Sequence, residues 1–548
     1  MKTIKRISAL VLAVLLMAGL SISAWAQEYD LYDGDITVTA DGSSQTVTHC
    51  RTDGVHVTED ANPTITSNGK TTDHTLTIYA TNDNAVANVT LGGVNIYNDP
   101  YNDGPAAVIT EGSGSVVIEL DGTNTVTSGT DHAGVEKNNN GTLTITDTNK
   151  DGGSLEATGG DRGAGIGGGN GADGTNITIS GGEVTATGGQ SGAGIGGGMS
   201  GAGTEITISG GTVTATGGMN GAGIGGGMRG AGTDITISGG TVTAVGVLAA
   251  GIGGGWNGDG TNITITGGEV TATGGEYGAG IGGGEYRSGT DITISGGTVT
   301  ATGGMNGAGI GGGDTSAGSD ITISGGTVTA TGERRGAGIG GGNAGAGSNI
   351  TISGDATVTA TGNYGGAGIG GGGSNTGSDI TISGDAQVHV TGSQESTAGD
   401  FSFGAGAAIG NGGGYSRDDN PPAGDEIDPD ISTLTASGSI SYYPAGTTVG
   451  QMQDGSVEPT KVVHGTYVPF SGVTFYTLSF DLGGGTIDGK SEYKLSAVFG
   501  QKIELPTPVK DGATFKGWKT TIDGEEVILE AGEQFTVKGA ASFTAIWE

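Results

Sequence analysis

The chain has 548 residues, of which 122 are glycine and one is cysteine, and its formal net charge is −36. So acidic a chain is a poor partner for nucleic acid or for an anionic membrane surface. A single cysteine excludes an internal disulfide framework, so we expect stability to come from backbone hydrogen bonds and packing.

Residues 1–26 are predicted to be a secretory signal peptide. Three basic residues lie among the first six, an apolar run extends from Ile7 to about Leu20, and Ala24-Trp25-Ala26 fits cleavage before Gln27. The alternative is a membrane helix, but the run is short for a bilayer span. We expect a secreted, extracellular protein associated with the cell envelope, without membrane insertion. The mature chain would carry a charge of −39, because the signal removes three basic residues.

Residues 27–160 hold short strands with irregular spacing, separated by turns rich in Asp, Asn and Gly. Examples are Asp35–Thr39, His74–Tyr79 and Ser115–Leu120. We interpret them as irregular coils that also cap one end of a longer stack, because a stack of open strands needs protected edges.

Residues 161–392 repeat one unit, which contains Gly-Ala-Gly-Ile-Gly-Gly-Gly or a close variant. The spacing is 29 residues, once 28 and once 30. The central isoleucines are Ile166, Ile195, Ile224, Ile252, Ile281, Ile310, Ile339 and Ile369. Such a period is typical of a solenoid.

Each unit also holds two stretches that alternate with period two. Ile177 and Ile179 flank Thr178, and Val184 and Ala186 alternate with threonine. Strands this short are buried only when identical units stack, about 4.8 Å apart. The predicted fold is all-β, a right-handed parallel β-helix or β-solenoid. The alternative is a disordered Gly-rich linker, which the strict period and the aliphatic columns disfavour.

The stretches Val89–Ile96, Ala106–Ile109 and Val116–Asn124 resemble the bacterial family of carbohydrate-binding β-helix domains, and the resemblance extends over roughly residues 30–415. The glycine-rich coils are similar to those of large bacterial surface proteins. The resemblance implies a parallel β-helix that binds polysaccharide, sometimes with calcium. Its motifs are mostly structural glycines and aliphatic residues, so they specify the fold better than the ligand.

Residues 393–432 are interpreted as the end of the solenoid and a linker, and 433–474 as a short β region. Residues 475–548 resemble the Listeria–Bacteroides repeat, also called the internalin B-repeat. The quoted segments are Tyr476–Thr486, Gly500–Lys510, Phe515–Trp518 and Phe543–Trp547; Ala513 departs from the family's usual aromatic residue. The resemblance implies a small β-grasp-like domain, with Trp518 and Trp547 as core residues.

No coil convincingly breaks the repeat with carboxylates and a base together, so we expect a protein that is not an enzyme. The six histidines share no metal-ligand spacing. The alternative of a nucleophile at Cys50 beside His49 is disfavoured, because adjacent strand residues face opposite sides. A degenerate polysaccharide lyase is kept as a further alternative.

One repeated row is acidic or amide and precedes each Ile-Thr-Ile stretch. It includes Asp234, Asp291, Asp320 and Asp379, as well as Asn176, Glu205, Asn262 and Asn349. Stacked carboxylates repel one another, and Ca²⁺ would relieve that repulsion. The alternative, which we favour, is an Asx-type turn with a solvated side chain. No other cofactor is expected.

A second row is threonine, as in Thr214-Ala-Thr216. Double threonine ladders resemble those of ice-binding solenoids, but Thr also suits an exposed strand, and Val245 and His389 interrupt the ladder.

The third row lies beside each glycine motif, where the coils differ from one another. Exposed aromatic residues beside acidic ones suit stacking on sugar rings and hydrogen bonding to hydroxyls. We predict Trp256, Tyr277, Tyr286 and Tyr364 as ligand contacts. The alternative is drift at unconstrained loop tips. The prediction is a monomeric binding protein for polysaccharide or for a host or bacterial surface glycan. The alternative is a structural stalk that displays the C-terminal domain.

Overall fold

The computed structural model describes residues 27–398, 401–416, 421–465, 476–487, 489–491, 493–497, 501–522 and 525–548. The predicted signal peptide lies outside these residues. The chain divides into two compact units, Met1–His464 and Gly465–Glu548. Within the described residues, no helix is both long and apolar enough to cross a bilayer.

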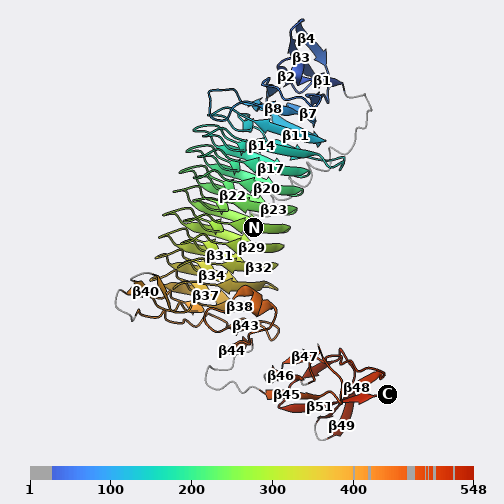
Figure 1. Ribbon diagram of the computed structural model, residues 1–548, viewed down its shortest axis with the longest axis vertical. Coiled ribbons are helices and arrows are strands. Elements are labelled where there is room, and N and C mark those ends of the chain that lie inside the picture. The colour runs from blue at the N-terminus through green and yellow to red at the C-terminus, as the bar shows by residue number, and fades with distance from the viewer. Residues whose placement is uncertain are drawn as a thin grey trace. The chain divides into compact units, whose positions relative to one another are not determined.

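The first unit is a β-solenoid in which every regular coil gives one strand to each of three sheets (Figure 1). The prediction of a β-solenoid is therefore confirmed.

The first sheet has 13 strands, whose regular members are six residues long. In order they are β1 (Glu28–Asp30), β5 (Thr64–Thr66), β7 (Val86–Gly92), β10 (Ser115–Asp121), β13 (Leu143–Thr146), β16 (Gly174–Ile179), β19 (Gly203–Ile208), β22 (Gly232–Ile237), β25 (Gly260–Ile265), β28 (Gly289–Ile294), β31 (Gly318–Ile323), β34 (Gly347–Ile352) and β37 (Gly377–Ile382).

The second sheet also has 13 strands, and its regular members are five residues long. They are β8 (Asn95–Tyr97), β11 (Thr123–Thr127), β14 (Ser154–Thr158), β17 (Glu183–Thr187), β20 (Thr212–Thr216), β23 (Thr241–Val245), β26 (Glu269–Thr273), β29 (Thr298–Thr302), β32 (Thr327–Thr331), β35 (Thr357–Thr361), β38 (Gln387–Thr391), β43 (Ser439–Tyr442) and β44 (Lys461–His464).

The third sheet has 15 strands, and its regular members are only two residues long. They are β4 (Gly54–Glu59), β3 (Gln45–Arg51), β2 (Ile36–Ala40), β6 (Leu76–Ala80), β9 (Val108–Gly112), β12 (Val135–Lys137), β15 (Ile166–Gly167), β18 (Ile195–Gly196), β21 (Ile224–Gly225), β24 (Ile252–Gly253), β27 (Ile281–Gly282), β30 (Ile310–Gly311), β33 (Ile339–Gly340), β36 (Ile369–Gly370) and β41 (Ile409–Gly410).

The parallel register places identical residues on top of one another and so builds the core. Ile177 pairs with Ile206, Val184 with Val213, and the Ile166-type residues form a further column. These side chains are almost completely buried and belong to one continuous core cluster. The alternation of apolar and polar residues predicted columns of aliphatic side chains, and these columns form the interior of the solenoid.

Glycine is required where the third sheet turns sharply. Gly196 has φ of +133°, and a Cβ there would lie 2.0 Å from the carbonyl oxygen of Gly225 in the next coil. Only a residue without a side chain fits such a position. The glycine motif is therefore structural and explains the two-residue strand.

Antiparallel strands cover both ends of the stack. At one end β3 pairs antiparallel with β2 and with β4. At the other end β44 pairs antiparallel with β43. The remaining elements of this unit are the 3-10 helix η1 (Leu31–Asp33), the helix α2 (Val449–Gln453) and a small sheet of β39 (Ser396–Ala398), β40 (Phe401–Phe403) and β42 (Tyr415–Ser416).

The second unit is a small mixed β domain. Its strands are β45 (Tyr476–Asp481), β46 (Tyr493–Ala497), β47 (Lys502–Glu504), β48 (Phe515–Ile522), β49 (Glu525–Leu529), β50 (Gln534–Thr536) and β51 (Ala541–Trp547). The strand β45 runs parallel to β51, and the other described pairs of strands are antiparallel. Its described residues form a mixed sheet like that of a β-grasp and include no helix. Trp518 is fully buried and Trp547 packs against the same core, as expected.

Candidate functional site

Beside the two-residue strands of the third sheet, the loop that follows the strand in one coil contacts the loop that precedes the strand in the coil before it. The amide of Met199 donates to the carbonyl of Arg162 at 2.8 Å, and the amide of Asp314 donates to that of Tyr277 at 2.8 Å. These loops meet along a strip of the surface, which we name the seam. Its first tip row is 161–162, 190–191, 219–220, 247–248, 276–277, 305–306, 334–335 and 363–364, and its second is 170–171, 199–200, 228–229, 256–257, 285–286, 314–315, 343–344 and 373–374.

Three of the four predicted contact residues lie on two neighbouring coils of the seam. The indole N–H of Trp256 donates to the carboxylate of Glu285, which is only 8% exposed. The phenol of Tyr286 bonds to the same carboxylate, and this bond raises the pKa of Tyr286. A bond to Glu276 likewise raises the pKa of Tyr277. The structure therefore brings aromatic rings and carboxylates together, with Tyr286 56% exposed.

A second carboxylate lies in the next coil of the seam. Asp314 is 8% exposed, and the amide of Asn343 donates to it at 2.8 Å. Burial raises the pKa of Asp314, and the charge of Glu285 acts in the same direction, whereas hydrogen bonds from Asn343 and Asn306 oppose it. The middle of the seam thus holds two buried carboxylates, Glu285 and Asp314, on neighbouring coils.

The fourth predicted residue, Tyr364, lies farther along. It is 45% exposed and occupies the first tip row three coils beyond Tyr277, about 14 Å at the usual strand spacing. Beside it, the guanidinium of Arg335 lies 5.2 Å from the ring centre of Phe403 and 5.4 Å from that of Tyr415. Burial lowers the pKa of Arg335. Tyr364 therefore lies apart from the other three predicted residues.

One irregular coil carries a group of polar side chains that the sequence reasoning missed. Nδ1 of His132 lies 2.7 Å from Oε2 of Glu136, and Asp131 pairs with Arg162 at 3.1 Å. The bond from Glu136 raises the pKa of His132. The expectation that no coil joins a carboxylate and a base is therefore corrected.

The signal for that group is a degenerate copy of the repeat. His132-Ala-Gly-Val-Glu-Lys137 occupies the place of Gly163-Ala-Gly-Ile-Gly-Gly168 in the next coil, and Glu136 pairs with Gly167. Reading the motif with substitutions allowed would have found it. The side-chain contacts themselves follow only from the fold, because the fold turns Glu136 back onto the preceding loop.

The acidic row proposed for calcium has a backbone explanation. Asp234, Asp291, Asp320 and Asp379 all have φ between 52° and 56°. Asn and Asp tolerate this left-handed conformation better than most residues. Both paired strands skip this position between the paired threonine and isoleucine without a change of register, so the row is a left-handed kink within the strand rather than an Asx turn.

Amide side chains interrupt the charges of this row. Asn262 donates to Asp234, and Asn349 donates to Asp320. Over the residues that the structure describes, no group of three His, Cys, Asp or Glu side chains is placed to hold a metal. The calcium site at Asp234, Asp291, Asp320 and Asp379 stays a prediction.

The threonine ladder is in register but broken. Thr214 pairs with Thr243, whereas Thr216 pairs with Val245 and Thr359 with His389. The interruptions expected from the sequence therefore fall inside the ladder itself.

Comparison with known proteins supports both halves of this architecture. A Beta helix repeat family matches residues 151–170, 177–199, 206–228, 235–256, 263–285, 292–314, 321–343 and 350–373. A Listeria-Bacteroides repeat domain matches residues 476–546. No curated protein and no solved structure matches the chain. The chain is thus a repetitive β-solenoid protein that also carries a Listeria-Bacteroides repeat domain.

Proposed function

We propose that this chain is a secreted, envelope-associated, non-catalytic protein that binds extended polysaccharide along its seam. The observation that carries the proposal is the gathering of Trp256, Tyr277 and Tyr286 on two neighbouring coils beside the buried carboxylate of Glu285. Aromatic faces pack against the C–H faces of pyranose rings, and carboxylates accept hydrogen bonds from their hydroxyls.

The spacing of the coils suits an extended ligand. Successive coils rise by about 4.8 Å, which is close to the length of one pyranose unit in a glycan. A chain lying along the seam would meet one pair of loop tips per sugar, and many weak contacts would add through multivalency. The proposed partner is a polysaccharide or a surface glycan, bound by a monomer.

A second candidate is a stalk that displays the C-terminal domain. It is favoured by the division into two units with separate cores and by the uniformity of the coils outside the seam. In this case recognition would belong to residues 476–546, and the seam would have no ligand.

Binding of the mature chain to a glycan array, followed by titration of the best glycan, tests the first candidate. Tyr286→Ala and Tyr364→Ala remove exposed rings without opening the core, and each is expected to weaken binding by roughly threefold to tenfold. Trp256→Phe keeps a ring but removes the indole donor to Glu285, so a smaller loss is expected.

Tyr79→Ala is the matched control, because Tyr79 is an exposed tyrosine outside the seam. A chain that ends at His464 should bind as the full chain does. Unchanged binding in the seam variants, together with loss of binding in the shortened chain, would establish the stalk instead.

A further inference from the structure

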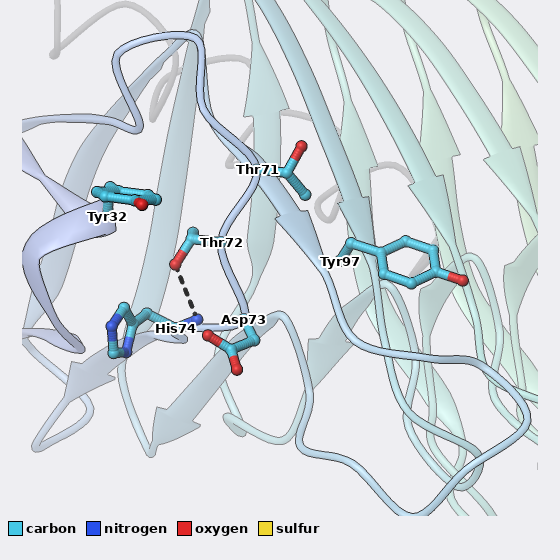
Figure 2. Close-up of a pocket in the computed structure, with 6 residues that line it drawn as sticks. All are labelled: Tyr32, Thr71, Thr72, Asp73, His74 and Tyr97. Carbon is cyan, nitrogen blue, oxygen red and sulfur yellow. Dashed lines mark hydrogen bonds between the residues drawn. The ribbon is translucent and has the colours of Figure 1, made fainter.

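A hollow of about 440 Å³ lies in the irregular coils at the N-terminal end of the solenoid (Figure 2). It is lined by Tyr32, Thr71, Thr72, Asp73, His74 and Tyr97. None of these residues belongs to the repeated unit, so the hollow occurs once in the described chain rather than once per coil. A unique constellation is what specific recognition requires, whereas repeated coils supply the same groups many times.

The walls of the hollow are fixed by the fold. Tyr32 lies in η1, where Asp30 caps the helix by accepting from the amide of Tyr32, and the neighbouring Leu31 is fully buried. On the other side, Thr72 extends the second sheet, because its amide donates to Asn95 at 3.0 Å and its carbonyl accepts from Tyr97 at 2.8 Å. The backbone that carries the side chains is therefore hydrogen-bonded on both sides.

The two tyrosines are held outward while their neighbours fill the core. Tyr32 is 45% exposed and Tyr97 is 53% exposed, although Leu31 and Ile96 beside them are completely buried. The ammonium group of Lys70 lies 4.1 Å from the ring centre of Tyr32 and covers one of its faces. Figure 2 shows the two rings on opposite sides of the 71–74 segment, with Tyr97 directed away from Tyr32. A ligand that touches both rings would therefore lie across the segment.

The polar groups between the rings are mainly hydrogen-bond acceptors. The hydroxyl of Thr72 accepts from the amide of His74 at 3.1 Å, and that of Thr71 accepts from Asn95 at 3.1 Å. Nδ1 of His74 lies 3.4 Å from Asp35, which orients the ring. Asp73 is exposed at the rim and offers two acceptor oxygens. Sugar hydroxyls, which can donate hydrogen bonds, match such a surface.

From this geometry we propose that the hollow is a second glycan-binding site, which takes a short neutral oligosaccharide. Pyranose rings would contact Tyr32 and Tyr97, and their hydroxyls would bond to Asp73, His74 and Thr71. Carboxylates outnumber cations near the hollow. Asp73 lines it, Asp30 and Asp33 lie next to Tyr32 in the chain, and Asp35 lies 3.4 Å from His74. The nearby cations are Lys70, which covers Tyr32, and Arg51, which pairs with Asp33. This balance of charge disfavours uronate or sulfated sugars. The site does not depend on the seam.

The test is calorimetric titration of the mature chain with the hexasaccharides of glucose, xylose and mannose, and with the galacturonate hexasaccharide. At least one neutral hexasaccharide should bind, and galacturonate should bind more weakly. Tyr32→Ala and Tyr97→Ala should each weaken that binding by roughly threefold to tenfold. Asp73→Asn should also weaken it, because it replaces an acceptor oxygen without changing the size of the side chain.

Tyr79→Ala is again the control, because this exposed tyrosine lies in the same region but does not line the hollow. If Tyr97→Ala loses binding and Tyr286→Ala does not, the proposal of a site in the hollow is supported, even if the seam binds nothing. If only Tyr286→Ala loses binding, that proposal is overturned, and the proposal of binding along the seam stands. Failure of all three neutral sugars to bind, or stronger binding of galacturonate, also overturns the proposal.

Discussion

Lys137 lies inside the solenoid, where every regular coil places an apolar residue or a glycine. It is 4% exposed and pairs with the buried Thr110, and its ammonium group donates to the carbonyl of Asn139. No carboxylate accounts for its position: burial alone lowers its pKa to about 8. The folded protein therefore carries a cost at neutral pH that the unfolded chain does not.

We predict that Lys137→Met stabilises the protein at pH 7. Below about pH 8 the lysine is charged in both states, so the folded state bears the full cost of burying the charge. As the pH rises from about 8 to 10.5, the folded state loses its proton first and the cost disappears. The upper limit of the gain is about 3 kcal/mol.

Thermal melts of the wild type and the variant, followed by circular dichroism across this range, check the prediction. The difference in Tm should shrink toward pH 10.5. A difference that is constant with pH would mean that packing, and not charge, sets the effect of the substitution.

Among the elements, the two-residue strands of the third sheet depend most on glycine. At Gly196 a Cβ would meet the carbonyl oxygen of Gly225 at 2.0 Å, and φ is +133°. Gly171, at a loop tip of the preceding coil, has φ of +73° and nothing within 4 Å of a Cβ. The two glycines share a positive φ and differ in the space around them.

We predict that Gly196→Ala lowers the free energy of unfolding by several kcal/mol, because backbone cannot move aside as a flexible side chain would. Gly171→Ala should cost only about 1 kcal/mol, the strain of a left-handed non-glycine residue. Urea unfolding of both variants gives the comparison. Equal losses would show that φ, rather than the contact between coils, makes glycine necessary.

The row of left-handed residues before each Ile-Thr-Ile stretch gives a second prediction at this scale. Asn262 separates Glu205 and Asp234 from Asp291 and Asp320, and its amide donates to Asp234. Asn262→Asp would remove the donor and stack five acidic side chains in succession, so we expect a lower Tm at low salt and partial recovery with Ca²⁺. Asn262→Gly keeps the positive φ without a charge and serves as the control. A wild-type Tm that rises with Ca²⁺ and falls with a chelator would instead support the predicted calcium row.

The sequence was sufficient to predict the structure of the elements that repeat, but it was not sufficient to predict the structure of those that do not. Period two in Ile177–Ile179 and Val184–Ala186 predicted buried columns, because burial in a strand alternates by residue. Trp256 and Glu285 are 29 residues apart, so their contact was implicit in the repeat. The hollow was not, because the segment 71–74, which lines it together with Tyr32 and Tyr97, is irregular and has no second copy in the sequence.

At the scale of the whole molecule, the chain divides into two compact units, each with its own hydrophobic core. The core of the solenoid runs from Tyr29 to Tyr442, and a separate core of residues 478–545 contains Trp518 and the stacked rings of Phe480 and Phe543, whose centres lie 4.7 Å apart. The two clusters share no member. We therefore expect each core to contribute separately to the free energy of unfolding, so that the two contributions add.

We predict that the mature chain unfolds in two independent transitions. A protein that ends at His464 should keep the solenoid transition within a few degrees, because both antiparallel ends of its stack are retained. A fragment of residues 476–548 should show the other transition alone. Scanning calorimetry of the three proteins decides the matter: a shift of the solenoid transition by more than a few degrees on truncation would mean that the C-terminal domain supports the stack. A matched control is deletion of β43 and β44, which should destabilise the solenoid, because it bares the parallel edge of β38.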